Sequence, residues 1–150
     1  MLCFTLDGQL KETHIDQQLS EIYAPVVDDC YSLAEKDGLI YMLYYSYTVI
    51  AAFDDTVVRR VWILSDKEPD SEAFYQLAIS EEGFLVGTFN CYSEELESSL
   101  YLISADVSQE MEEITCCDSN GEALDIQQLK LTSNAVYAVA SSGIYKQDIQ

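Results

Sequence analysis

The sequence predicts an all-β protein built from antiparallel strands. The stretch 38–64 (GLIYMLYYSYTVIAAFDDTVVRRVWIL) is rich in Tyr, Ile, Val and Thr, which pack well on a pleated sheet. It lacks the polar face that a soluble helix shows every three or four residues. Its apolar run is shorter than the roughly 18 residues that a membrane helix needs, and it is interrupted by tyrosines. We therefore expect strands and no insertion into a membrane.

Three strands and two turns account for this central stretch. The apolar run divides into Leu39–Tyr45 and Tyr47–Phe53, joined by a tight turn. Asp54-Asp55 is a polar turn, and Thr56–Leu64 is the third strand. The first two strands do not alternate apolar with polar residues, a pattern typical of strands that are covered on both faces. In an antiparallel protein this predicts further sheets stacked on either side.

The N-terminal segment predicts a hairpin followed by a short irregular element. Met1–Leu6 is a short strand, and Asp7-Gly8 is a turn signal of the kind that joins hairpin strands. Gln9–Ile15 is expected to return as the second arm. The segment Asp16–Tyr23 fits a single helical turn or a loop, and Pro25 ends either.

Further short apolar segments predict strands on both sides of the central stretch. They are separated by turn signals such as Lys36–Gly38, Ser80–Gly83 and Ser133-Asn134. The expected strands are Cys30–Glu35, Ala73–Ile79, Phe84–Phe89, Ser98–Ser104, Met111–Thr115, Ile126–Thr132, Ala135–Ala140 and Ile144–Ile149.

The strand pattern repeats along the chain. The turns at Gly38, Gly83 and Asn134 are spaced by roughly 45 and 51 positions, and each follows a strand containing a Leu-x-x or Leu-x-Leu pattern. Recurrence at this spacing, with about four short strands per unit, resembles β-propeller repeat proteins in general. No blade ends in Trp-Asp or opens with Gly-His, so the resemblance identifies no particular family.

The resemblance implies one all-β domain over residues 1–150. It contains a partial blade at 1–15, two blades at 30–64 and 73–115, and a partial blade at 126–149. Propellers need four to eight blades. The resemblance therefore implies a partial propeller that a longer chain or a partner would complete. A single closed β-barrel or β-sandwich is the alternative fold.

The charge is strongly negative. The chain has 27 acidic and 7 basic residues, a formal net charge of −20, and much of the acidity lies between the apolar segments. Direct binding to nucleic acid is excluded, since no basic patch is present to displace counterions from phosphates. The charge predicts solubility first, and beyond it a protein partner of basic character.

No residue pattern predicts catalysis, a metal site or a cofactor. His14 is the only histidine, and the five cysteines form no Cys-x-x-Cys pair. The N-terminus lacks the basic start and long apolar run of a signal peptide. We therefore expect reduced, structural thiols, including the vicinal Cys116-Cys117, and a cytoplasmic or nuclear location.

The candidate interface lies in the central stretch. Tyrosines are enriched at protein interfaces, and the two arginines form the only cationic doublet. The expected function is a non-enzymatic protein–protein interaction or scaffold module within a larger assembly. The alternative is an acidic inhibitor that mimics nucleic acid and occupies a basic protein. The candidate interface residues are Tyr44, Tyr45, Tyr47, Arg59 and Arg60.

Overall fold

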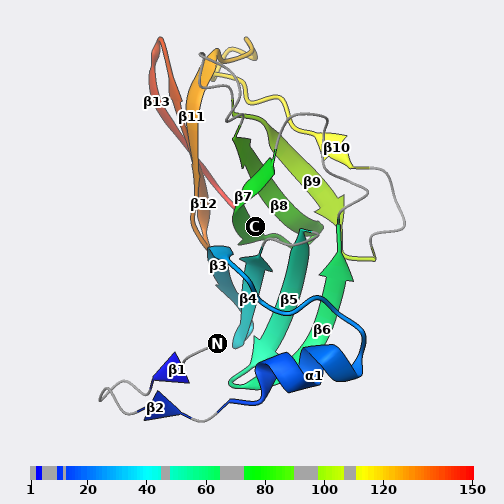
Figure 1. The fold of residues 1–150 in the computed structure, drawn as a ribbon. Coiled ribbons are helices and arrows are strands. Elements are labelled where there is room, and N and C mark those ends of the chain that lie inside the picture. The colour runs from blue at the N-terminus through cyan, green and yellow to red at the C-terminus, as the bar shows by residue number, and fades with distance from the viewer. Residues whose placement is uncertain are drawn as a thin grey trace.

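The chain is all-β with one short helix (Figure 1). The computed structural model describes residues 3–4, 10–11, 13–44, 48–64, 73–89, 98–106 and 111–150. The elements are β1 (Cys3–Phe4), β2 (Leu10–Lys11), α1 (Ile15–Glu21), β3 (Cys30–Lys36), β4 (Leu39–Tyr44), β5 (Val49–Asp54), β6 (Val57–Ile63), β7 (Ala73–Ile79), β8 (Gly83–Phe89), β9 (Leu100–Ser104), β10 (Glu112–Glu113), β11 (Ile126–Leu131), β12 (Ala135–Ala140) and β13 (Gly143–Asp148).

The strands form three main antiparallel sheets, in which each strand pairs with its neighbours along the chain. The first sheet has the order β3-β4-β5-β6, the second β7-β8-β9-β10, and the third β11-β12-β13, while β1 and β2 form a separate pair. Figure 1 shows the three sheets arranged in succession along the molecule. The first strand of each sheet lies near the first strand of the next, β3 near β7 and β7 near β11. None of these sheets closes on itself, so the described chain is not a single closed barrel.

Most of the expected strands from Cys30 onward are confirmed, although β10 covers only Glu112–Glu113 of the expected 111–115. The expected second arm, Gln9–Ile15, is wrong at its end, because Ile15 begins α1 and β2 covers only Leu10–Lys11. The predicted cover on both faces is confirmed for β5, where the five residues from Val49 to Phe53 are all buried. It is wrong for the first half of β4, where Ile40 is 43% exposed. The expected turn at Tyr45-Ser46 lies outside the described residues. The segment expected to be a helical turn or a loop is the seven-residue helix α1. No helix in the described part of the chain is long and apolar enough to cross a bilayer.

The first strand of each sheet carries an irregularity at the same place. Pairing with the next strand shifts around Tyr31 in β3, Tyr75 in β7 and Gln127 in β11. Such a bulge bends its strand and re-aims the side chains beside it. The three strands can therefore be aligned from this point onward. Corresponding positions are Ser32, Gln76 and Gln128; Leu33, Leu77 and Leu129; Ala34, Ala78 and Lys130; and Glu35, Ile79 and Leu131.

Polar side chains next to the bulges join neighbouring sheets. Ser32 Oγ accepts a hydrogen bond of 3.1 Å from the backbone N–H of Leu77, linking the first sheet to the second. Gln76 makes two bonds of 2.7 Å to the third sheet: its amide donates to the carbonyl of Leu129 and accepts from the N–H of Leu131. The same position on successive sheets thus performs the same task.

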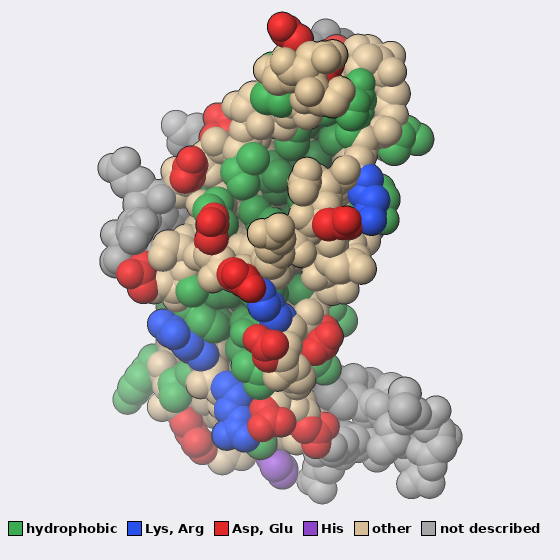
Figure 2. Space-filling model, turned by 180° about the vertical axis from the view of Figure 1, so that it is seen from behind, with side chains coloured by type: hydrophobic (Ala, Val, Ile, Leu, Met, Phe, Trp, Pro, Cys, Tyr) green, Lys and Arg blue, Asp and Glu red, His purple; other side chains and the backbone are tan. Residues whose placement is uncertain are grey.

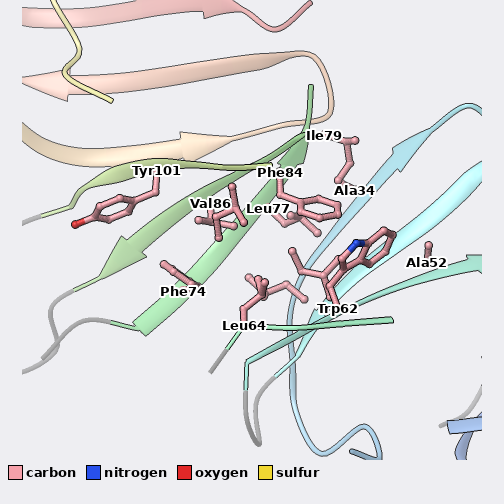
Figure 3. Close-up of a cluster of buried hydrophobic side chains, with 13 residues drawn as sticks. Ala34, Ala52, Trp62, Leu64, Phe74, Leu77, Ile79, Phe84, Val86 and Tyr101 are labelled. Atoms are coloured by element: carbon pink, nitrogen blue, oxygen red, sulfur yellow. The ribbon is translucent and has the colours of Figure 1, made fainter. Parts of the chain in front are cut away.

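Apolar side chains fill the space between the sheets. Trp62 meets Phe84 edge-on, with ring centroids 4.8 Å apart, at the centre of the cluster between the first and second sheets (Figure 3). A second cluster lies between the second and third sheets, and a third lies between the first sheet and α1. The second cluster comprises Ala78, Leu85, Leu100, Leu129, Leu131, Val136 and Ala138, and the third Ile15, Leu19, Met42, Tyr44, Val49, Ala51 and Phe53.

Helix α1 covers only part of the outer face of the first sheet. Ile15 and Leu19 are buried against that sheet. Gln18 fixes the helix on the β5–β6 turn by donating to the carbonyl of Thr56 and accepting from the N–H of Val58, both at 2.9 Å. We call the surface of the first sheet that faces α1 the helix face.

Replacing Gln76 with Ala should lower the free energy of unfolding by about 1–3 kcal/mol, because two backbone groups of β11 lose their partner. Gln127→Ala is the matched control, since Gln127 is an exposed glutamine of β11 with no side-chain hydrogen bond within the described part of the chain. Urea unfolding of both variants tests this expectation. Equal losses from the two variants would show that Gln76 does not join the sheets.

Candidate functional site

Only part of the predicted interface lies at an exposed surface. Tyr44 is completely buried, and its hydroxyl donates a hydrogen bond of 2.9 Å to the carbonyl of Pro25. The expectation that Tyr44 forms part of an accessible interface is therefore wrong for this structure: it anchors the segment between α1 and β3 to the sheet. Tyr45 and Tyr47 lie outside the described residues.

The arginine doublet lies at a groove between the first and second sheets. The groove encloses about 730 Å³, with Tyr41, Trp62 and Phe84 among its aromatic lining residues. Arg59 is salt-bridged to Asp54. Arg60 lies 4.8 Å from the centre of the Trp62 ring, and its guanidinium donates to the carbonyl of Ala105 at 3.5 Å, while Trp62 Nε1 donates to that same oxygen at 2.8 Å. The remaining lining residues include Lys36, Asp37, Ser80 and Glu81.

These contacts assign a structural task to Arg60, whereas Arg59 pairs only within the β5–β6 hairpin. Arg60 and Trp62 both bond a loop that follows β9, so they link the outer parts of the first two sheets. The other charges that line the groove balance, because Lys36 and Arg59 are matched in number by Asp37 and Glu81. Electrostatic attraction for a charged ligand is correspondingly small. His14 is exposed and precedes α1, which packs on the opposite face of the first sheet from the groove.

A patch on the helix face is apolar and exposed. Leu33 on β3 is 60% exposed, although the corresponding Leu77 and Leu129 are 1% and 6% exposed. In the second and third sheets this leucine is covered by the sheet that precedes it. Ile40 pairs with Glu35 and is diagonal to Leu33 on the same face, and it is 43% exposed. Sequence reasoning missed this patch, because only the alignment of the bulges reveals that Leu33 should be covered.

The other end of the stack is also uncovered. We call the surface of the third sheet that faces away from the second sheet the far face. It presents Gln128 and Lys130 from β11 and Ile144 from β13, all exposed. Tyr137 and Val139 of β12 lie between them and are half-buried. The far face is thus a mixed apolar and polar surface.

The described carboxylates are dispersed. Asp37, Asp55 and Glu82 lie on turns at one end of the sheets, whereas Asp29 and Asp125 precede β3 and β11 at the opposite end. Figure 2 likewise shows Asp and Glu side chains spread along the whole length of the visible face. Among the described residues, no group of three or more His, Cys, Asp or Glu side chains is placed to hold a metal ion.

Cys30, Cys116 and Cys117 are free thiols. Cys116 and Cys117 line a second cavity, of about 490 Å³, together with Leu100 and Tyr145. Burial raises the pKa of the Cys116 thiol, and Cys117 adds to the effect. A raised pKa leaves less of the reactive thiolate at neutral pH, which favours a structural thiol over a redox centre.

Comparison with known proteins assigns the chain to a family. A model of the YxzG family matches residues 1–147. The chain is also 85% identical over 150 residues to "Uncharacterized protein YxzG" of Bacillus subtilis (strain 168), and this similarity covers 100% of both chains. The chain therefore belongs to the YxzG family. The name of this relative states no substrate or partner.

Stability should decline in alkali because of Tyr44. Burial, with a smaller effect of the Asp16 carboxylate, raises the pKa of Tyr44 from 10.0 to about 12. Between these values the unfolded chain loses the phenolic proton while the folded chain keeps it. The contribution of Tyr44 to the free energy of unfolding is therefore fully present below pH 10.0, and it is lost as the pH rises toward about 12.

The test is denaturant unfolding of the wild type and Tyr44→Phe at several pH values from neutral to alkaline. Below pH 10.0 the variant should lose about 1 kcal/mol with the hydrogen bond to Pro25. It should also show a shallower alkaline decline than the wild type. Parallel pH profiles would contradict the assignment to Tyr44.

Proposed function

We propose that this member of the YxzG family is a non-enzymatic protein–protein interaction module whose three sheets are propeller-like blades. Several observations support the blade interpretation. Each main sheet is an antiparallel meander of three or four strands, and the first strands of successive sheets lie against one another. The bulges recur at corresponding positions, as expected if the sheets are repeats of one unit.

The exposure of Leu33 carries the functional proposal. Leu33 has the position in its sheet that is buried in the next two, and apolar neighbours flank it on the helix face. Exposed apolar patches on folded proteins mark interaction sites more often than chance. A module of three sheets, with both end surfaces available, is suited to docking against another protein along the exposed first strand.

The proposed setting is a reducing compartment such as the cytoplasm. The free thiols of Cys30, Cys116 and Cys117 support this proposal. The net charge of −20 would attract a partner of basic character over a distance, while the apolar patch would provide the contact itself.

The inhibitor that mimics nucleic acid is the less favoured candidate. Mimicry of a phosphate backbone requires carboxylates arrayed on one face. The described carboxylates instead lie on turns, strands and connecting segments at both ends of the sheets, and they are spread over the visible face (Figure 2). This distribution favours a solubilising role for the charge.

Leu33→Asp should abolish partner binding without unfolding the chain. The side chain is 60% exposed, so the free energy of unfolding should change by less than about 0.5 kcal/mol. The measurement compares proteins retained from a native lysate by the immobilised wild type and variant. Val57→Asp is the matched control, because Val57 is 44% exposed on another part of the first sheet.

The expected result is one set of specific proteins retained by the wild type and Val57→Asp and lost by Leu33→Asp. Retention of the same set by all three chains would show that the patch is not the interface. Absence of any specific retained protein, with no self-association either, would refute the interaction module.

A further inference from the structure

We propose that the occupant of the exposed first strand is a second copy of this chain, bound head to tail. In this arrangement β11 of one copy lies along β3 of the other, as β7 lies along β11 within the chain. The inference rests on the proposed function, since it names the partner of the Leu33 patch. It is carried by the correspondence of positions between the sheets and by the charges at the two ends of the stack.

The internal contact between the second and third sheets shows how such a junction is made. Gln76 bonds the carbonyl of Leu129 and the N–H of Leu131, two groups on the edge of β11 that faces away from β12. Ala78, two residues after Gln76, packs in one apolar cluster with these leucines. The junction therefore combines one glutamine, one small apolar side chain and two residues of the next first strand.

The two end surfaces of the three-sheet stack carry the groups that form this junction: the glutamine is on the far face, and the two backbone groups are on β3. Gln128 corresponds to Gln76, and it makes no side-chain hydrogen bond within the described part of the chain. Leu33 and Glu35 correspond to Leu129 and Leu131, on a strand that has only β4 as a neighbour in its sheet. Repeating the internal geometry between copies places Gln128 beside the carbonyl of Leu33 and the N–H of Glu35.

The charges at the ends are complementary where the internal junctions are apolar. Lys130 stands at the position of Ala78, and Glu35 at the position of Leu131. In the repeated geometry Lys130 therefore lies near Glu35 of the other copy, at the places that Ala78 and Leu131 hold in one apolar cluster within the chain. Glu35 accepts a hydrogen bond of 3.0 Å from the N–H of Gly38, which holds its carboxylate at the β3–β4 turn. Both side chains are exposed in the single chain, in which they lie in different sheets.

Only the part of the helix face next to β3 is available for this contact. Helix α1 and the segment after it cover Met42, Tyr44 and Phe53, so the second copy meets mainly β3 and the exposed Ile40. One such contact is small. A two-fold pair makes two of them at once, and each raises the effective concentration for the other. Two copies also supply six main sheets, within the range of four to eight blades that propellers contain.

The test is sedimentation equilibrium of the purified full chain, its single variants and a charge swap. The wild type should associate reversibly to a dimer. Lys130→Glu should raise the dissociation constant about fivefold or more, because two carboxylates then face each other, and Glu35→Lys should do the same. The double variant E35K/K130E should return the dissociation constant toward that of the wild type, since the pair is restored with its polarity reversed.

The control is the double variant E82K/K130E, which has the same net charge as E35K/K130E. Glu82 lies on the β7–β8 turn of the second sheet, away from both end surfaces. Restoration by E35K/K130E alone would establish the contact between copies. Equal restoration by both would show that net charge governs association, and it would overturn the proposed geometry.

The outcomes also separate this inference from the proposed function. A wild type that stays monomeric at its highest soluble concentration overturns the second copy as occupant. If the immobilised wild type then retains a different protein from the lysate, and Leu33→Asp does not, the interaction module stands without the dimer. Loss of dimerisation in Leu33→Asp, with no other protein retained, supports both.

Discussion

Gln76 joins two sheets with two hydrogen bonds from one side chain, and the rest of the structure depends on contacts of this kind. The first strand of each sheet pairs with its own sheet on one edge and must have its other edge satisfied by something else. The bulges before Ser32 and Gln76 aim a polar side chain at the neighbouring first strand, whereas Gln128 holds the same position on the exposed far face. Apolar residues behind that strand then fill the space between the sheets.

The same need for cover explains why β5 is apolar on both faces and why the outer surface of the first sheet is only partly covered. A sheet with neighbours on both sides needs apolar side chains on both faces, and the first sheet obtains its second neighbour from α1. The helix is short, however, and covers only the part of the face that carries Met42 and Phe53. Leu33 and Ile40 keep the apolar character of a covered face without a cover among the described residues.

Sequence reasoning located almost every strand, because turn signals such as Gly38 and Gly83 separate short runs of β-forming residues. It could not place Tyr44 correctly. A tyrosine suits a buried position and an interface equally well, and the acceptor that decides the matter is the carbonyl of Pro25, which the fold brings near. The bulges were equally invisible, because they depend on the pairing of two strands and carry no residue signature in Tyr31 or Gln127.

The exposed patch at Leu33 could not be predicted from the sequence, and the reason is physical. Exposed leucines are common on protein surfaces, so a single exposed leucine says little about function by itself. It becomes informative when repeated units provide internal references, as Leu77 and Leu129 do for Leu33. Charge at Glu35 and Lys130, in place of the apolar residues of the inner junctions, keeps the ends soluble while they are separate. Opposite charge at corresponding places also favours a head-to-tail contact over a face meeting its own copy, where like charges would be opposed.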